Sequence, residues 1–107
     1  MSEKIYNCPV EATLAQIGGK YKAIILYHLL ADGVLRYGEL ARYVPSATPK
    51  MLVKQLRELE ADGLITRVVY PVVPPKTEYS LTERGESLRG VITSICDWGR
   101  TYMAGTF

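Results

Sequence analysis

The stretch Thr48–Gly85, TPKMLVKQLRELEADGLITRVVYPVVPPKTEYSLTERG, decides the fold because it joins a helix to a hairpin. Its first part is typical of an amphipathic helix. Thr48 has the chemistry of an N-cap, Pro49 suits the first helical position, and Gly63 supplies a C-terminal stop. Three leucines follow the i, i+4, i+7 spacing of a buried stripe: Leu52, Leu56 and Leu59.

The rest of this stretch reads as two strands around a proline-rich tip. LITRVVY (64–70) and TEYSL (77–81) have the composition of strands, whereas PVVPPK (71–76) contains three prolines. Proline cannot donate to a sheet ladder, which excludes a central strand through the tip. We therefore expect a β-hairpin whose tip is a semi-rigid finger beside the helix.

The flanking sequence supplies the other elements of a winged helix. Upstream, the patterns predict a helix from Pro9 to the Gly18-Gly19 pair, a second over about 20–31, a strand at VLR (34–36) and a helix at YGELARYV (37–44). Downstream, Thr82 is placed to cap a final helix over 83–103. One apolar face of that helix repeats Leu88, Ile92, Ile95, Gly99 and Tyr102.

The expected fold is mainly α with a small β-hairpin (α+β), a winged helix-turn-helix with flanking N- and C-terminal dimerisation helices. We expect one domain over 1–107, consistent with the chain length. Its parts are the first two helices (9–31), the helix-turn-helix (34–63), the wing hairpin (64–81) and the last helix (83–103). The apolar face of the last helix has two interpretations: it pairs with a symmetry mate in a C2 dimer, or it closes the monomer's own core.

Composition limits the class of protein. The chain is 48% hydrophobic and 22% charged, which is ordinary for a globular domain. Its longest apolar runs are too short to span a bilayer, and the first residues lack a hydrophobic signal core, so a cytoplasmic protein without a membrane partner is expected. Two distant cysteines and a single histidine, His28, form no zinc-spaced cluster. We expect no metal and no cofactor.

Positive charge is concentrated in the middle of the chain. Residues 20–76 hold nine Lys/Arg against five Asp/Glu, a balance of +4, whereas the flanks have a balance of −2. Within the helix after Thr48, basic residues come first and acidic residues last, the reverse of what the helix macrodipole favours. That arrangement costs about one kcal/mol or less if exposed, so another requirement is implied. Insertion of the helix N-terminus into the major groove of DNA is one such requirement.

A division of roles follows for this helix and the hairpin. Lys50, Lys54 and Arg57 share one face. The lysines of this helix suit phosphates, whereas Ser46, Thr48 and Gln55 suit base edges. The other interpretation of this pattern is a solvated amphipathic helix. The residues predicted at the DNA interface are Arg36, Ser46, Thr48, Pro49, Lys50, Met51, Lys54, Gln55, Arg67 and Lys76, with Arg42 beside them. Tyr37 and Tyr43 lie in apolar helical patterns and are expected to pack rather than to stack on bases.

The segments CPVEATLAQIGGKYKAIIL, RYGELARYV, the Thr48–Gly85 stretch and CDWG resemble the HxlR family of bacterial winged-helix regulators, which is related to MarR-type regulators. The resemblance covers about Cys8 to Trp98. It implies a homodimeric transcription factor that binds double-stranded DNA, and in several members a cysteine before the first helix senses electrophiles or oxidants. Cys8 matches that position, which implies a small electrophile or oxidant as effector. Tyr21 stands where the family usually has tryptophan.

The two cysteines and His28 also have interpretations that give them no functional role. Cys8 lies at a predicted helix start, with Lys4 upstream and Lys20 or Lys22 expected near it in space, which would favour the thiolate. The other interpretation of Cys8 is an unreactive small residue at the N-terminus of the helix. Cys96 lies within the last helix, where burial is expected, although it is also the candidate for a resolving thiol. His28 is expected to pack or to lie at the surface.

Three functions follow from these patterns. The first is a sequence-specific regulator that binds an inverted-repeat operator as a homodimer. The second is a winged-helix module that contacts proteins without operator binding; salt-dependent, sequence-selective DNA binding separates the two. The third is a thiol enzyme built on Cys8, for which the sequence offers neither a histidine base nor a C-x-x-C pair. We expect a regulator and not an enzyme.

Overall fold

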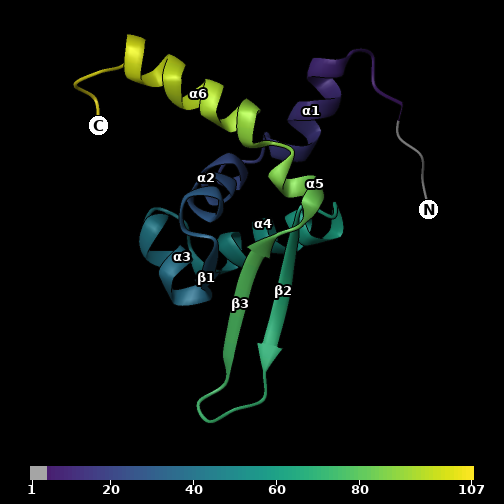
Figure 1. Cartoon of the computed structure of the whole chain (residues 1–107), viewed down its shortest axis with the longest axis vertical. Coiled ribbons are helices and arrows are strands. Elements are labelled where there is room, and N and C mark those ends of the chain that lie inside the picture. The colour runs from purple at the N-terminus through teal and green to yellow at the C-terminus, as the bar shows by residue number, and fades with distance from the viewer. Residues whose placement is uncertain (1–4) are drawn as a thin grey trace.

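A computed structural model describes residues 5–107 of the chain (Figure 1). The elements are α1 (Pro9–Ile17), α2 (Lys22–Asp32), β1 (Val34–Arg36), α3 (Tyr37–Tyr43), α4 (Pro49–Ala61), β2 (Ile65–Tyr70), β3 (Lys76–Leu81), α5 (Glu83–Glu86) and α6 (Arg89–Tyr102). The strands form an antiparallel sheet in the order β1-β3-β2. This is the mainly helical winged helix that the sequence predicts.

Helix α4 follows its sequence signals closely. The Thr48 Oγ1 accepts a hydrogen bond from the Met51 amide at 3.2 Å, and Pro49 occupies the start of the helix. Beyond the helix end, Gly63 adopts a positive φ of 74°, which favours glycine over any other residue. The three leucines of the stripe are almost fully buried. The predicted caps and buried face are therefore confirmed.

The hairpin β2–β3 projects away from the helices, and its tip over 71–75 lies opposite the end of the molecule that carries α1 and α6 (Figure 1). Its register runs from Ile65 opposite Leu81 to Tyr70 opposite Lys76. The strand predicted at 34–36 is confirmed as β1, which pairs with β3 and makes the sheet three-stranded. Burial of Leu35 opposite Tyr79 ties β1 to the core.

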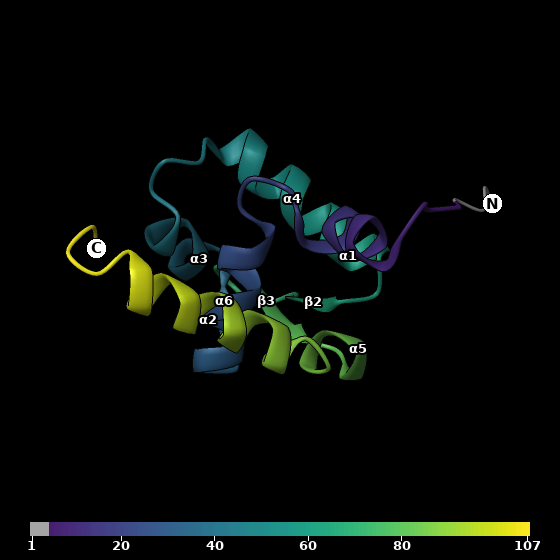
Figure 2. The same cartoon turned by 90° about the horizontal axis from the view of Figure 1, so that it is seen from above.

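Helix α2 lies at the centre of the fold and packs against α1, α3, α4, α6 and the sheet. The fully buried side chains come from α2, α3, α4 and the start of β2: Ile25, Leu26, Leu29, Leu40, Leu52, Leu56, Leu59, Leu64 and Ile65. Viewed from above, α4 and α6 lie on opposite sides of the molecule (Figure 2). No helix within residues 5–107 has the length and hydropathy that a bilayer crossing requires.

The prediction of one helix over 83–103 is wrong in one respect, because the segment forms two helices, α5 and α6, that are separated at Ser87 and Leu88. Thr82 caps only the first, accepting from the Gly85 amide at 3.0 Å and donating to the Gly63 carbonyl at 2.6 Å. These contacts hold α5 against the chain that follows α4, while α6 leaves in another direction. Helix α2 also begins two residues later than expected, with Tyr21 as its N-cap.

Gly85 lies at this junction, and replacing it with alanine is expected to destabilise the protein by about 1–3 kcal/mol, the usual cost of overpacking. A Cβ at Gly85 would lie 2.1 Å from the Leu64 carbonyl oxygen, so the backbone would have to move. Urea denaturation measures the effect. Gly90→Ala is the matched control, because nothing lies within 4 Å of its Cβ position. Equal midpoints for the two variants would contradict the assigned packing.

Candidate nucleic-acid interface

The exposed face of α4 carries a row of cations. Lys50, Lys54 and Arg57 are all exposed, and none of them pairs with an acid within residues 5–107. Pro49, Val53 and Ala61 border the same surface. The row is therefore available to an anionic partner, with the buried leucines on the other side of the helix.

The start of α4 and the turn before it also lie at the surface. Ser46, Thr48 and Pro49 are exposed, and 37% of the Met51 side chain is accessible. The Thr48 hydroxyl is already used as the acceptor of the helix cap, which leaves it free to donate. These residues surround the end of α4 that a helix-turn-helix places against bases.

The hairpin is less positive than its sequence suggests. The Arg67 Nε lies 3.5 Å from Glu60 Oε1, and the Lys76 Nζ lies 3.8 Å from Glu78 Oε2 and 4.6 Å from the centre of the Tyr70 ring. The tip over 71–75 is uncharged. Arg36 and Arg42 are exposed around a depression that Glu39 also lines, and neither arginine forms an ion pair within residues 5–107. The Glu39 carboxylate accepts from the Arg36 amide at 2.8 Å.

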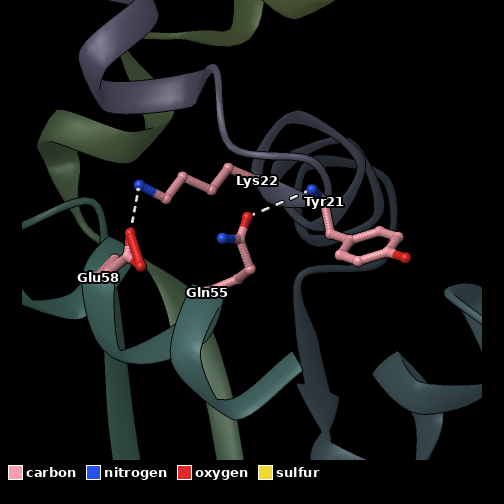
Figure 3. A network of polar contacts seen from close by, with 4 residues as sticks. All are labelled: Tyr21, Lys22, Gln55 and Glu58. Carbon is pink, nitrogen blue, oxygen red and sulfur yellow. Dashed lines mark hydrogen bonds and ion pairs between the residues drawn. The ribbon is translucent and has the colours of Figure 1, made fainter. Parts of the chain in front are cut away.

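Gln55, predicted to read base edges, turns toward α2 instead. Its Oε1 accepts a hydrogen bond from the Tyr21 amide at 3.2 Å, and the side chain is half-buried (Figure 3). Beside it, Glu58 Oε2 lies 2.9 Å from the Nζ of Lys22. The hydrogen bond from Lys22 holds the pKa of Glu58 below its usual value, and burial opposes this shift. Sequence reasoning missed this contact; the only signal for it was a lysine at a position that the apolar pattern of α2 buries.

Cys8 lies where the sequence places it, as the exposed N-cap of α1, and its Sγ accepts from the Glu11 amide at 3.5 Å. The expected cations are engaged elsewhere: Lys22 pairs with Glu58, and Lys20 lies over the Tyr21 ring at 5.4 Å. Lys4 is outside the described residues. The expected lysine pair near Cys8 is therefore not found within residues 5–107.

Cys96 is a free, half-buried thiol packed against the core, less buried than expected. The His28 ring stacks on Tyr43 at 3.9 Å between centroids, and burial lowers the pKa of His28. The Tyr43 hydroxyl donates to Asp32 Oδ2 at 2.7 Å. Tyr37 is half-buried against the core. The predicted packing roles of His28 and the two tyrosines agree with these contacts.

An apolar groove between α1 and α6 is left uncovered by the rest of residues 5–107. It is lined by Pro9, Val10, Thr13, Leu14, Ile17, Val91 and Ile95. Val10, Leu14 and Ile95 are 65%, 55% and 51% exposed and form an apolar patch at the surface. Trp98 and Tyr102 continue the exposed surface along α6.

Known proteins resemble this chain over nearly its whole length. A family model described as HxlR-like helix-turn-helix matches residues 16–106. YtcD of Bacillus subtilis (strain 168), an HTH-type transcriptional regulator, is 54% identical over 103 residues, which cover 96% of this chain and 81% of YtcD. The redox regulator HypR in its oxidised form is 53% identical with a TM-score of 0.82, and the match covers 88% of this chain and 96% of HypR.

A MarR-family transcriptional regulator from Porphyromonas gingivalis W83 has a TM-score of 0.85 at 35% identity, covering 95% of this chain and 99% of that structure. The relation that the sequence motifs suggested is therefore confirmed. The chain belongs to the HxlR-like helix-turn-helix family of transcriptional regulators.

Proposed function

We propose that this protein regulates transcription as a homodimer that binds an inverted repeat in double-stranded DNA, with α4 in the major groove. The observation that carries the proposal is the row of unpaired cations, Lys50, Lys54 and Arg57, on the exposed face of the second helix of a helix-turn-helix. The relatives named above are helix-turn-helix transcriptional regulators, which supports the same assignment.

Within this proposal, the residues divide by chemistry. The cations of α4 contact phosphates, and the exposed Ser46, Thr48 and Met51 face the base edges. Pro49 fixes the start of the helix, and Arg36, Arg67 and Lys76 contribute at the periphery. The uncharged wing tip, with Val73 fully exposed, offers apolar contact with sugars rather than another phosphate contact.

Dimerisation is proposed through the groove between α1 and α6. A C2 axis there would bring Leu14 and Ile95 of one protomer against the same surface of its partner. Half-site centres are then expected to lie about one helical turn of DNA, or a multiple of it, apart.

Redox or electrophile sensing through Cys8 is the finer part of the proposal. Two observations support it: the exposed thiol caps α1, and the chain is 53% identical to the redox regulator HypR. Helix α1 also lines the proposed dimer groove, so a modified Cys8 acts on the helix that sets the separation of the two α4 helices.

The basic residues provide the test of the DNA interface. Lys50→Ala and Lys54→Ala are each expected to weaken binding to all sequences similarly and to lower the salt slope by about one. Lys76→Ala is expected to have a smaller effect on affinity and salt slope, because Lys76 already forms an ion pair with Glu78. Fluorescence anisotropy with labelled duplexes over a range of salt concentrations measures both quantities.

Arg100→Gln is the matched control, because it removes one cation from α6, on the side of the molecule opposite α4 (Figure 2). Its salt slope should equal that of the wild type. Binding without any salt dependence, or equal effects of Arg100→Gln and Lys54→Ala, would refute the assigned interface. Sequence-independent binding would favour the protein-interaction alternative.

A further inference from the structure

Lys22 is the only charged side chain that is buried within residues 5–107, with 6% of its surface exposed. Burying an ammonium group is costly unless it is paired. The pairing comes from another helix, because its Nζ lies 2.9 Å from Glu58 Oε2 on α4. The first residue of α2 is thus bound to the helix that carries the cationic row.

The preceding residue makes a second contact with α4. Tyr21 is the N-cap of α2, and its side chain makes no capping hydrogen bond within that helix. The Tyr21 amide donates to Gln55 Oε1 at 3.2 Å, so a side chain from α4 satisfies an amide at the start of α2 (Figure 3). In an ordinary capping box, the side chain at position N3 of the same helix accepts this hydrogen bond from the N-cap amide.

The ring of Tyr21 supplies a third contact, on the turn that leads into α4. Its hydroxyl donates to the Ser46 carbonyl at 3.2 Å, and the side chain is only 2% exposed. Two consecutive residues of the α1–α2 region therefore hold α4 at three places: before its start, at Gln55 and at Glu58.

The turn between α1 and α2 fits closely against these groups. A Cβ at Gly19 would lie 2.5 Å from Gln55 Oε1 and 2.9 Å from the Cδ of Lys22. A side chain at position 19 would therefore displace the ends of Gln55 and Lys22, the two side chains that connect α4 and α2 here.

These polar contacts fix the rotation of α4, which the burial of its leucine stripe alone does not fix. Apolar burial is non-directional, whereas hydrogen bonds fix direction as well as distance. Gln55 and Glu58 are adjacent in sequence to Lys54 and Arg57, so a rotation of α4 that breaks the contacts also moves the cationic row. Recognition requires side chains held within about 0.5 Å of the productive geometry.

We propose that Tyr21, Lys22, Gln55 and Glu58, together called the α2–α4 clamp, set the sequence selectivity of the protein by fixing the rotation and pitch of α4. The inference rests on the proposed function. Within it, the clamp members are positioning residues that act through α4 and touch no base. Non-specific affinity depends on phosphate charge and is retained when the clamp is lost, whereas discrimination between sequences depends on geometry and falls.

Two variants test the clamp without changing net charge. Gln55→Leu removes the acceptor, and the double variant Lys22→Met/Glu58→Gln removes the ion pair. The probes are a duplex that the wild type selects from a random-sequence pool and a scrambled duplex of the same composition. The ratio of the two affinities is expected to fall about tenfold or more, while the affinity for the scrambled duplex and the salt slope stay within about twofold.

The control is Arg89→Met/Glu86→Gln, which removes an exposed ion pair of the same 2.9 Å length from the α5–α6 region. Its affinity ratio should match that of the wild type. If the clamp variants lose affinity equally for both duplexes, the clamp has a purely structural role. If neither affinity changes, the clamp has no role. Either result overturns the inference.

Amide hydrogen exchange provides a readout that does not depend on DNA. The Tyr21 amide is expected to exchange faster in Gln55→Leu than in the wild type, and unchanged protection would contradict the hydrogen bond on which the clamp depends. Failure of the proposed function itself is recognised separately, because the wild type would then select no duplex, and the selectivity role would fall with it.

Discussion

Replacement of Leu14 and Ile95 by aspartate is expected to convert the protein to a monomer and to weaken operator binding by about a hundredfold to ten-thousandfold. Both side chains line the groove between α1 and α6 and are more than half exposed in the single chain. Charges introduced into an apolar interface lose hydration without gaining a partner. A monomer binds each half-site independently and loses the high effective concentration that a linked second site provides.

Analytical ultracentrifugation gives the oligomeric state, and anisotropy on a two-half-site duplex gives the affinity. Val34→Asp is the control, since Val34 is 54% exposed on the edge strand β1, outside the groove. It should remain a dimer. If the Leu14→Asp/Ile95→Asp protein stays dimeric, the interface lies elsewhere. If it is monomeric but binds the two-half-site duplex with wild-type affinity, dimerisation is not required for DNA binding.

Oxidation or alkylation of Cys8 is expected to weaken operator binding about a hundredfold, near the upper end of typical coupling between sites. An electrophilic quinone forms a new carbon–sulfur bond with the thiolate and takes up the thiol proton. Diamide instead takes two electrons and two protons from two thiols, which form a disulfide. Either product attaches a new group to the Sγ that accepts from the Glu11 amide, at the start of a helix that lines the dimer groove.

Cys8→Ser is the informative variant, because serine is a good N-cap and preserves the start of α1. It should bind DNA like the wild type and lose the response to diamide or a quinone. Cys96→Ser should keep both properties unless Cys96 is the resolving thiol. Non-reducing electrophoresis distinguishes an intersubunit disulfide from adduct formation. A full oxidant response in Cys8→Ser would end the sensing proposal and leave the DNA-binding proposal intact.

The features that the sequence predicted correctly are those whose causes are local. Thr48, Pro49 and the leucine stripe determine α4 within a few residues, and the prolines of the tip exclude a continuous strand. The helix start at Pro9 and the position of Cys8 follow from the same capping rules.

The features that were missed depend on contacts between distant residues. The last helix divides next to Gly85, which packs closely on the Leu64 carbonyl, and the pairing of the predicted strand at 34–36 with β3 places Leu35 opposite Tyr79. Gln55 looked like a base reader because a helical wheel places it beside the cationic face. Only the packing of α2 against α4 shows that its oxygen caps Tyr21.

The central claim, that two α4 helices read two half-sites, is tested most directly by footprinting the wild-type dimer on a duplex selected from the source genome. Two protected regions in inverted orientation are expected, with centres about one helical turn or a multiple of it apart. Both regions should lose protection together in the Leu14→Asp/Ile95→Asp variant. Protection of a single half-site by a monomeric wild-type protein at micromolar concentration would contradict the claim.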